Sequence, residues 1–157
     1  MKYSAQEVIQ YVNEEDVKFI RLTFCDVYGR QKNISIMPSE LPRAFEYGIA
    51  FDASSIDGLG DEMQSDLFLR PDPETLAVLP WRPEHGRVIR MFCTITKPNG
   101  DVYECDTRNV LKKAIKYAKD RGIEFYFGSE LEFYLFKLDE KGEHTKVLEG
   151  AKKKGYV

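Results

Sequence analysis

The chain has 157 residues, of which 43% are hydrophobic and 31% are charged; this balance is typical of a folded globular protein. Its 26 acidic and 23 basic side chains give a net charge of −3, without the basic surplus of a general nucleic-acid binder. No run reaches the roughly 18 apolar residues of a membrane span, and the N-terminus lacks the apolar core of a signal peptide. We therefore expect a cytoplasmic protein that binds neither nucleic acid nor membrane.

Two residue types limit the chemistry further. The three cysteines, Cys25, Cys93 and Cys105, are odd in number and widely spaced, which is typical of reduced thiols rather than of a disulfide framework or a metal knuckle. The two histidines, His85 and His144, offer little material for a Ser-His-Asp triad or a histidine-rich metal site. Hydrolase chemistry of that kind is disfavoured.

The first third of the chain predicts a helix, a hairpin and a second helix. Ser4 and Glu7 have capping-box spacing, and apolar residues then recur at helical intervals over 5–14. Two β-rich runs, 17–24 and 34–36, flank a turn and predict a β-hairpin. We expect Ser39 to cap the second helix, which continues to Tyr47 and ends before Gly48.

The middle of the chain is rich in predicted strands. A short apolar strand over 49–53 leads into a loop over 54–65, whose length is typical of functional or disordered segments. Further strands are predicted over 66–69, 75–79 and 87–96, and the last is followed by a turn and an antiparallel return at Val102 and Tyr103.

From residue 107 the pattern changes to a helix ending at Gly122, followed by a strongly β-type run over 123–138. The fold class is therefore α+β: a β-grasp-like domain, in which a sheet packs on one helix, over 1–105, and the start of a second domain over 106–157.

Two glutamates in the last β-type run could bind metal. If 127–136 is a strand, Glu130 and Glu132 lie on one face, about 6.5–7 Å apart at their Cα atoms. A divalent cation would offset their repulsion, and an oxygen-only ligand set suits Mg²⁺ or Mn²⁺. The alternative is that both glutamates are ordinary residues on the solvent face of an amphipathic strand.

A second group lies where the 49–53 strand meets the long loop. Asp52 is followed by Ser54 and Ser55, and a carboxylate beside two hydroxyls can bind a small cation or polarise a nucleophile. The alternative is an Asx turn, in which Asp52 bonds only the neighbouring backbone.

The two segments together resemble the glutamine synthetases, of the type I, bacterial and archaeal, branch. The resemblance includes Phe51-Asp52-Ala53-Ser54-Ser55, then Gln64-Ser65-Asp66, Pro71-Asp72, Leu79-Pro80-Trp81, and the run Phe127-Gly128-Ser129-Glu130-Leu131-Glu132-Phe133. These motifs occur in the family's order over nearly the whole chain.

The resemblance implies a β-grasp domain followed by the first helix and strands of a larger catalytic domain. It implies ATP-dependent ligation of ammonia to glutamate through γ-glutamyl phosphate, with Mg²⁺ or Mn²⁺ as cofactor. Glu130 and Glu132 would each be the first ligand of one metal ion. Asp52 would be the catalytic residue that helps bind and deprotonate ammonium in a neighbouring subunit, with Ser55 beside it as a substrate-binding residue. The full-length protein would be a homo-oligomer, a dodecamer of stacked rings.

The chain departs from the family at Ala53, where glycine is usual, and at Leu59, where an aromatic residue is frequent. Alanine is unfavourable at position 53 if the backbone there needs a positive φ. We expect the chain to be an N-terminal fragment, inactive alone, that exposes apolar surface over 123–138. Two alternatives stay open: a γ-glutamyl ligase acting on an amine or polyamine, and a non-catalytic β-grasp binding module.

Overall fold

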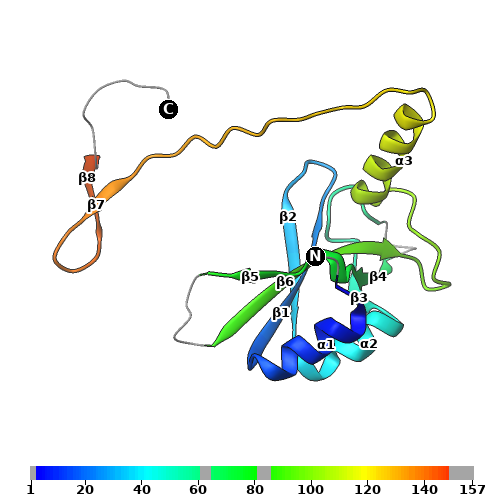
Figure 1. The fold of residues 1–157 in the computed structure, drawn as a ribbon, viewed down its shortest axis with the longest axis horizontal. Helices are drawn as coiled ribbons and strands as arrows, with labels where there is room; N and C mark the ends of the chain where they lie inside the picture. The colour runs from blue at the N-terminus through cyan, green and yellow to red at the C-terminus, as the bar shows by residue number, and fades with distance from the viewer. Residues whose placement is uncertain (1–2, 61–64, 81–85, 149–157) are drawn as a thin grey trace. The chain divides into compact units, whose positions relative to one another are not determined.

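A computed structural model of the chain describes residues 3–60, 65–80 and 86–148 (Figure 1). The contacts divide it into two compact units, Met1–Glu124 and Phe125–Val157, and each is considered by itself. Among the described residues, no helix combines the length and apolarity that crossing a bilayer requires. The boundary predicted after residue 105 stays a prediction.

The first unit opens with the predicted helix and hairpin. Helix α1, Ala5–Glu14, begins with the Ser4–Glu7 capping box, as the sequence predicts. Strands β1, Val17–Cys25, and β2, Gln31–Ile36, pair antiparallel. The second helix differs in its start: a 3₁₀ turn, η1, Pro38–Glu40, precedes α2, Leu41–Glu46, and neither has a side-chain cap. The prediction of Ser39 as a cap is wrong, because Pro38 already fixes the first turn.

The remaining strands complete one sheet. They are β3, Ile49–Asp52; β4, Asp66–Pro71; β5, Ala77–Leu79, after the 3₁₀ turn η2, Pro73–Thr75; and β6, Arg87–Thr96. The strand order is β2-β1-β6-β4-β3, and β5 pairs with β6. Strands β1 and β6 run parallel, with Ile20 opposite Ile89 and Leu22 opposite Met91; the other pairs of this sheet are antiparallel. The predicted return after β6 is reduced to one bridge between Thr96 and Val102.

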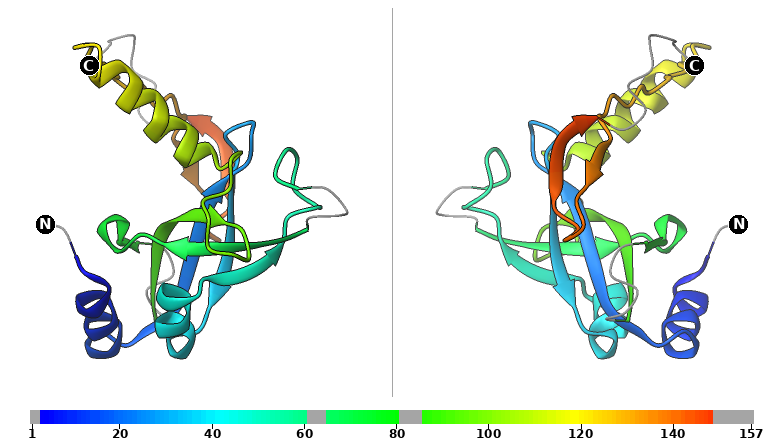
Figure 2. Two further views of the ribbon diagram at one scale, coloured as in Figure 1. Left: turned by 90° about the vertical axis from the view of Figure 1, so that its right-hand side faces the viewer. Right: turned by 90° about the vertical axis from the view of Figure 1, so that its left-hand side faces the viewer.

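The core lies between this sheet and the first two helices, which contact each other (Figure 2). Val8 and Val12 from α1, and Leu41 and Ala44 from α2, are buried in one cluster with the inward side chains of the strands. The expected α+β class and β-grasp-like sheet are confirmed, with the difference that two helices, rather than one, contribute to the core.

Helix α3, Thr107–Lys119, begins at the N-cap Asp106. Its apolar stripe is exposed: Val110, Leu111 and Ile115 each keep more than half of their surface open, and only Ala118 of the helix is buried. In the second unit, β7, Phe136–Leu138, pairs with β8, His144–Leu148, as a hairpin.

Candidate active site

Asp52 is the last residue of β3, where the alternation of the strand directs it to the surface. Phe51 is buried and its ring lies 5.1 Å from that of Phe24, centroid to centroid, whereas Asp52 is exposed. Asp52 pairs across the ladder with Asp66, the first residue of β4. The sheet therefore presents the Asp52 carboxylate at the start of the long loop.

The carboxylate is held by its own loop. Oδ1 of Asp52 accepts hydrogen bonds from the Ser54 hydroxyl at 2.6 Å and from the Ser54 backbone N–H at 2.9 Å. These two bonds lower the pKa of Asp52 below its usual value, and the bond from the hydroxyl has the larger effect. Both bonds stabilise the charged form of the carboxyl. Oδ2 accepts no hydrogen bond from the described residues. Asp52 is thus an ionised, exposed carboxylate, and the part of the chain that the structure describes donates hydrogen bonds to only one of its oxygens.

Ser55 lies next to Asp52, as the sequence predicts, but its hydroxyl donates to the Asp52 backbone carbonyl at 3.4 Å rather than to the carboxylate. The Asx turn expected as the alternative is therefore present in the same residues. The two interpretations are compatible, since the turn uses only Oδ1 of Asp52. Gln64 and Trp81, which also contribute to the family resemblance, lie outside the described residues.

The described part of the loop is ordered by its packing. Leu59 and Ala53 are fully buried, and Ala53 N–H donates to the Ser65 carbonyl at 2.7 Å. Ala53 has no positive φ, so alanine meets no backbone strain there. A Cβ built on Gly60 would lie 3.1 Å from the Ala53 Cβ, which shows that these residues are in close contact. Both departures from the family pattern, Ala53 and Leu59, thus fit the core of this chain.

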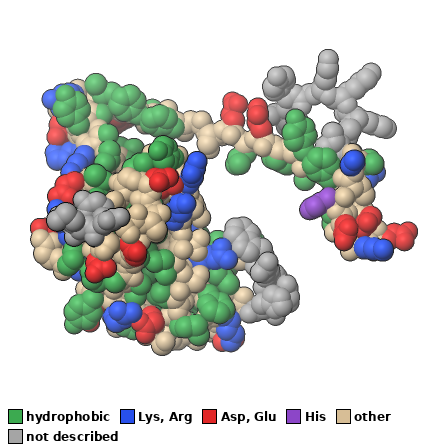
Figure 3. All heavy atoms as spheres, turned by 180° about the vertical axis from the view of Figure 1, so that it is seen from behind, with side chains coloured by type: hydrophobic (Ala, Val, Ile, Leu, Met, Phe, Trp, Pro, Cys, Tyr) green, Lys and Arg blue, Asp and Glu red, His purple; other side chains and the backbone are tan. Residues whose placement is uncertain are grey.

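The structure differs from the sequence prediction over 123–138. Residues 123–135 form no strand, and the predicted strand is reduced to β7, Phe136–Leu138. A strand is stable only when its backbone groups pair with a neighbour, and in the described residues β7 has one partner, β8. The expected exposure of apolar surface is present: Tyr126, Phe127 and Leu131 are 86–90% exposed (Figure 3).

Glu130 and Glu132 are consequently exposed residues of an irregular segment. They belong to the second unit and Asp52 to the first. Among the described residues, no three His, Cys, Asp or Glu side chains gather closely enough to hold a metal ion. Two carboxylates have the right donor chemistry for a hard cation but form only part of its coordination shell. The ligand assignment stays a prediction.

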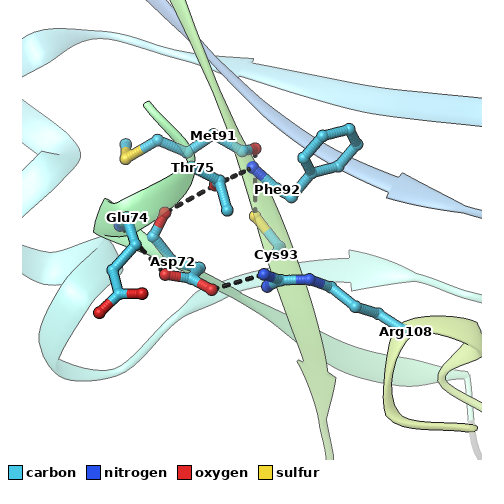
Figure 4. Close-up of polar contacts among 7 residues, drawn as sticks. All are labelled: Asp72, Glu74, Thr75, Met91, Phe92, Cys93 and Arg108. Atoms are coloured by element: carbon cyan, nitrogen blue, oxygen red, sulfur yellow. Dashed lines mark hydrogen bonds and ion pairs between the residues drawn. The ribbon is translucent and has the colours of Figure 1, made fainter. Parts of the chain in front are cut away.

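Sequence reasoning missed one ion pair. Oδ2 of Asp72 lies 2.5 Å from Nη2 of Arg108, and both side chains are about three-quarters buried (Figure 4). Asp72 is the N-cap of η2, and Arg108 lies in the first turn of α3. The two residues are 36 positions apart, and nothing in the sequence pattern pairs them.

Comparison with known proteins agrees with this architecture. The family description "Glutamine synthetase, beta-Grasp domain" matches residues 16–98, and "Glutamine synthetase, catalytic domain" matches residues 104–156. The chain belongs to the glutamine synthetase family. The β-grasp match coincides with the sheet from β1 to β6, and the catalytic-domain match begins just before α3.

Individual relatives agree with the family assignment. The chain is 43% identical over 144 residues to the glutamine synthetase of Clostridium saccharobutylicum and 45% identical over 143 residues to that of Methanosarcina mazei. These matches cover 92% and 91% of this chain but 32% of each relative. The chain therefore spans about a third of the length of these curated relatives. A cryo-EM structure of the Plasmodium falciparum glutamine synthetase superposes with a TM-score of 0.68 and 25% identity, over 78% of this chain and 24% of that one.

Proposed function

We propose that this chain forms the N-terminal part of an ATP-dependent ligase that joins ammonia to glutamate through γ-glutamyl phosphate. Membership of the glutamine synthetase family supports a ligase. The observation that carries the finer proposal is the Asp52 carboxylate, exposed at the end of β3 and kept ionised by Ser54. A fixed, exposed anion is suited to bind the ammonium cation, and we propose that it also accepts the ammonium proton before attack on the acyl phosphate.

The remaining roles follow the same proposal. We keep the domain boundary after residue 105, close to residue 104, where the catalytic-domain match begins. Ser55 donates to the Asp52 carbonyl within the same loop, and in this proposal it would border the substrate. Glu130 and Glu132 would be ligands of two Mg²⁺ or Mn²⁺ ions in the complete catalytic domain. When bound, such ions offset charge on the transferred phosphoryl group.

Asp52 would serve the active site of an adjacent subunit in a closed homo-oligomer, which we propose to be a dodecamer. Closed symmetric assemblies satisfy each such heterologous contact once per subunit. The glutamate and ATP pockets would then be formed outside these 157 residues, and the isolated chain would be inactive.

The test uses the full-length protein. Asp52→Ala should abolish ammonia-dependent glutamine formation while ATP and Mg²⁺ binding, measured by calorimetry, are retained. Asp57→Ala is the matched control, because Asp57 is an exposed carboxylate on the same loop. Unchanged ammonia kinetics in Asp52→Ala would return Asp52 to a purely structural turn residue. Turnover with alkylamines or polyamines in place of ammonia would favour the amine ligase.

Subunit mixing tests the shared site directly. Inactive Asp52→Ala and inactive Glu130→Ala subunits should regain activity when co-assembled, since some interfaces would pair an intact Asp52 with an intact Glu130. Complete failure to complement in well-formed mixed oligomers would refute an active site shared between subunits.

A further inference from the structure

Helix α3 meets the β-grasp sheet at its first turn. Nη2 of Arg108 contacts Oδ2 of Asp72 at 2.5 Å, and the Thr107 hydroxyl donates to the Cys25 carbonyl at 3.2 Å. Asp72 lies within the β-grasp match, whereas Thr107 and Arg108 lie within the catalytic-domain match. These contacts therefore join the two family segments inside one compact unit.

Asp72 is a rigid acceptor for this contact, because its other polar atoms are also bonded (Figure 4). Its backbone N–H donates to the Phe92 carbonyl at 2.8 Å, and Oδ1 accepts from the Glu74 N–H at 3.1 Å. Its carbonyl accepts from the Thr75 hydroxyl at 2.7 Å, and the same hydroxyl accepts from the Phe92 N–H at 2.8 Å. The carboxylate that receives Arg108 is thereby fixed to the middle of β6.

Beyond its first turn, α3 buries little of its surface against the rest of the described first unit. Three of its large apolar side chains remain more than half exposed. A second ion pair of the helix, Lys116 with Asp120, is confined to the helix end and is exposed to solvent. The location of the helix in the first unit thus depends on the contacts around Arg108.

We infer that Arg108 is a positioning residue that fixes the start of the catalytic-domain segment on the β-grasp sheet through Asp72. The segment that contains Glu130 and Glu132 follows α3 within a short stretch of chain. Fixing the first turn of the helix therefore fixes the point from which that segment departs. This last consequence rests on the proposed function; the contact itself does not.

Cys93 provides a local reporter. It is 1% exposed and lines the same hollow as Asp106, Thr107 and Arg108. Burial raises the pKa of the Cys93 thiol to about 12, so the thiol is protected from reagents by both access and protonation. Movement of α3 away from the sheet should uncover it, whereas a change at the far end of the helix should not.

The experiment measures the reaction of Cys93 with Ellman's reagent in the 157-residue chain carrying Cys25→Ser and Cys105→Ser. Arg108→Met, which removes the charge at similar length, should raise the rate at least tenfold under native conditions. Asp72→Asn should raise the rate similarly, because it removes the charge that pairs with Arg108. Asparagine can still accept from the Glu74 N–H, so the local turn is retained. Arg108→Lys should give a rate between that of the parent and that of Arg108→Met. The double variant Arg108→Met, Asp72→Asn should react little faster than either single variant.

Two controls separate local movement from a general loss of stability. Lys116→Met removes the exposed pair on the same helix and should leave the rate unchanged. Val12→Ala weakens the core at α1. Its Cys93 reaction rate should therefore rise only by the amount that its lower stability, measured by the urea midpoint, explains. A rate in Arg108→Met within twofold of the parent, or one explained entirely by its urea midpoint, would overturn the inference. No substrate is present in this assay, so its outcome is independent of the proposed ligase activity.

Discussion

Gly58 packs directly against Val27, which places the tip of the Asp52 loop on the turn between β1 and β2. A Cβ built on Gly58 would lie 2.5 Å from Cγ1 and 2.8 Å from Cγ2 of Val27. Gly58 also has a φ of +77°, which favours glycine over any residue with a side chain. The loop that carries Asp52 is therefore supported by a turn that is distant in sequence.

Gly58→Ala should lower the free energy of unfolding by about 1–3 kcal/mol, through backbone strain and overpacking together. Urea denaturation measures the loss. Val27→Ala in the same chain removes the two methyl groups and should recover the steric part only. The double variant should therefore remain about 1–2 kcal/mol below Val27→Ala, the cost of a non-glycine residue with positive φ. Full recovery would indicate that backbone conformation is unimportant at Gly58.

Asp26 holds the supporting turn. Its side chain is buried, and Oδ1 accepts from the Tyr28 N–H at 3.0 Å and the Arg30 N–H at 2.8 Å. Asp26→Ala would leave these donors unpaired and should cost about 1–3 kcal/mol. Asp26→Asn retains an acceptor and should cost less. Thermal unfolding checks the order, with the exposed Asp57→Ala as the control that should change little.

Ser54→Ala should raise the pKa of Asp52 towards its ordinary value, because the Ser54 hydroxyl is the main cause of its depression. An NMR titration of the Asp52 carboxyl measures the shift. Ser55→Ala is a matched control, since that hydroxyl contacts the backbone carbonyl of Asp52, and it should leave the pKa unchanged. Because its pKa is lowered in the folded state, Asp52 stabilises the fold at pH values above the ordinary pKa of an aspartate. This contribution is lost as the pH falls through the folded-state pKa.

Asp106 has the opposite pH dependence. Burial raises its pKa above the ordinary value of 3.8, and the hydrogen bond from the Arg108 N–H only partly opposes this. The native state then holds the proton to higher pH than the unfolded chain does, so this group lowers the free energy of unfolding as the pH rises from about 4 through the raised pKa. Asp106→Asn keeps an N-cap acceptor and should flatten that part of the profile, measured by urea denaturation. An unaltered profile would mean that Asp106 is not its source.

The exposed aromatic segment should make the chain self-associate. Phe127 and Leu131 are 90% and 86% exposed, and apolar segments with unpaired backbone favour intermolecular contacts. Sedimentation velocity should show the average mass rising with concentration, and the double variant Phe127→Lys, Leu131→Lys should suppress the rise. Tyr28→Lys, at an exposed site on the β1–β2 turn, should not suppress it.

Local sequence signals predicted local structure well. The Ser4–Glu7 capping box, the β1–β2 hairpin and the bounds of β6 follow from spacing and turn residues over a few positions, and all are confirmed. The exception is Ser39, where the fixed φ of the preceding proline leads to a 3₁₀ turn. The proximity of Asp52 and Ser55 is also predicted, because only two residues separate them in the sequence.

Long-range features could not be predicted in this way. The β-type residues of 123–138 have strand propensity, but propensity is realised only where a partner strand is available. The support of Gly58 by Val27 and the pairing of Asp72 with Arg108 each join segments whose local patterns are independent. Such contacts form only when the whole sheet has assembled, and no short window of sequence contains that information.

The parallel pairing of β1 with β6 has a consequence for biosynthesis. Thr23 pairs with Phe92, so the centre of the sheet joins segments made early and late, whereas the β1–β2 hairpin needs only local contacts. Closing so long a loop slows folding, and domains emerge from the ribosome N-terminus first. β6 also pairs with β4 and β5. Its three ladders, with β1, β4 and β5, can form only after β6 has been synthesised. A nascent chain halted before Arg87 would hold the hairpin but not the sheet, and its unpaired β1 edge would need protection until Thr96 has emerged.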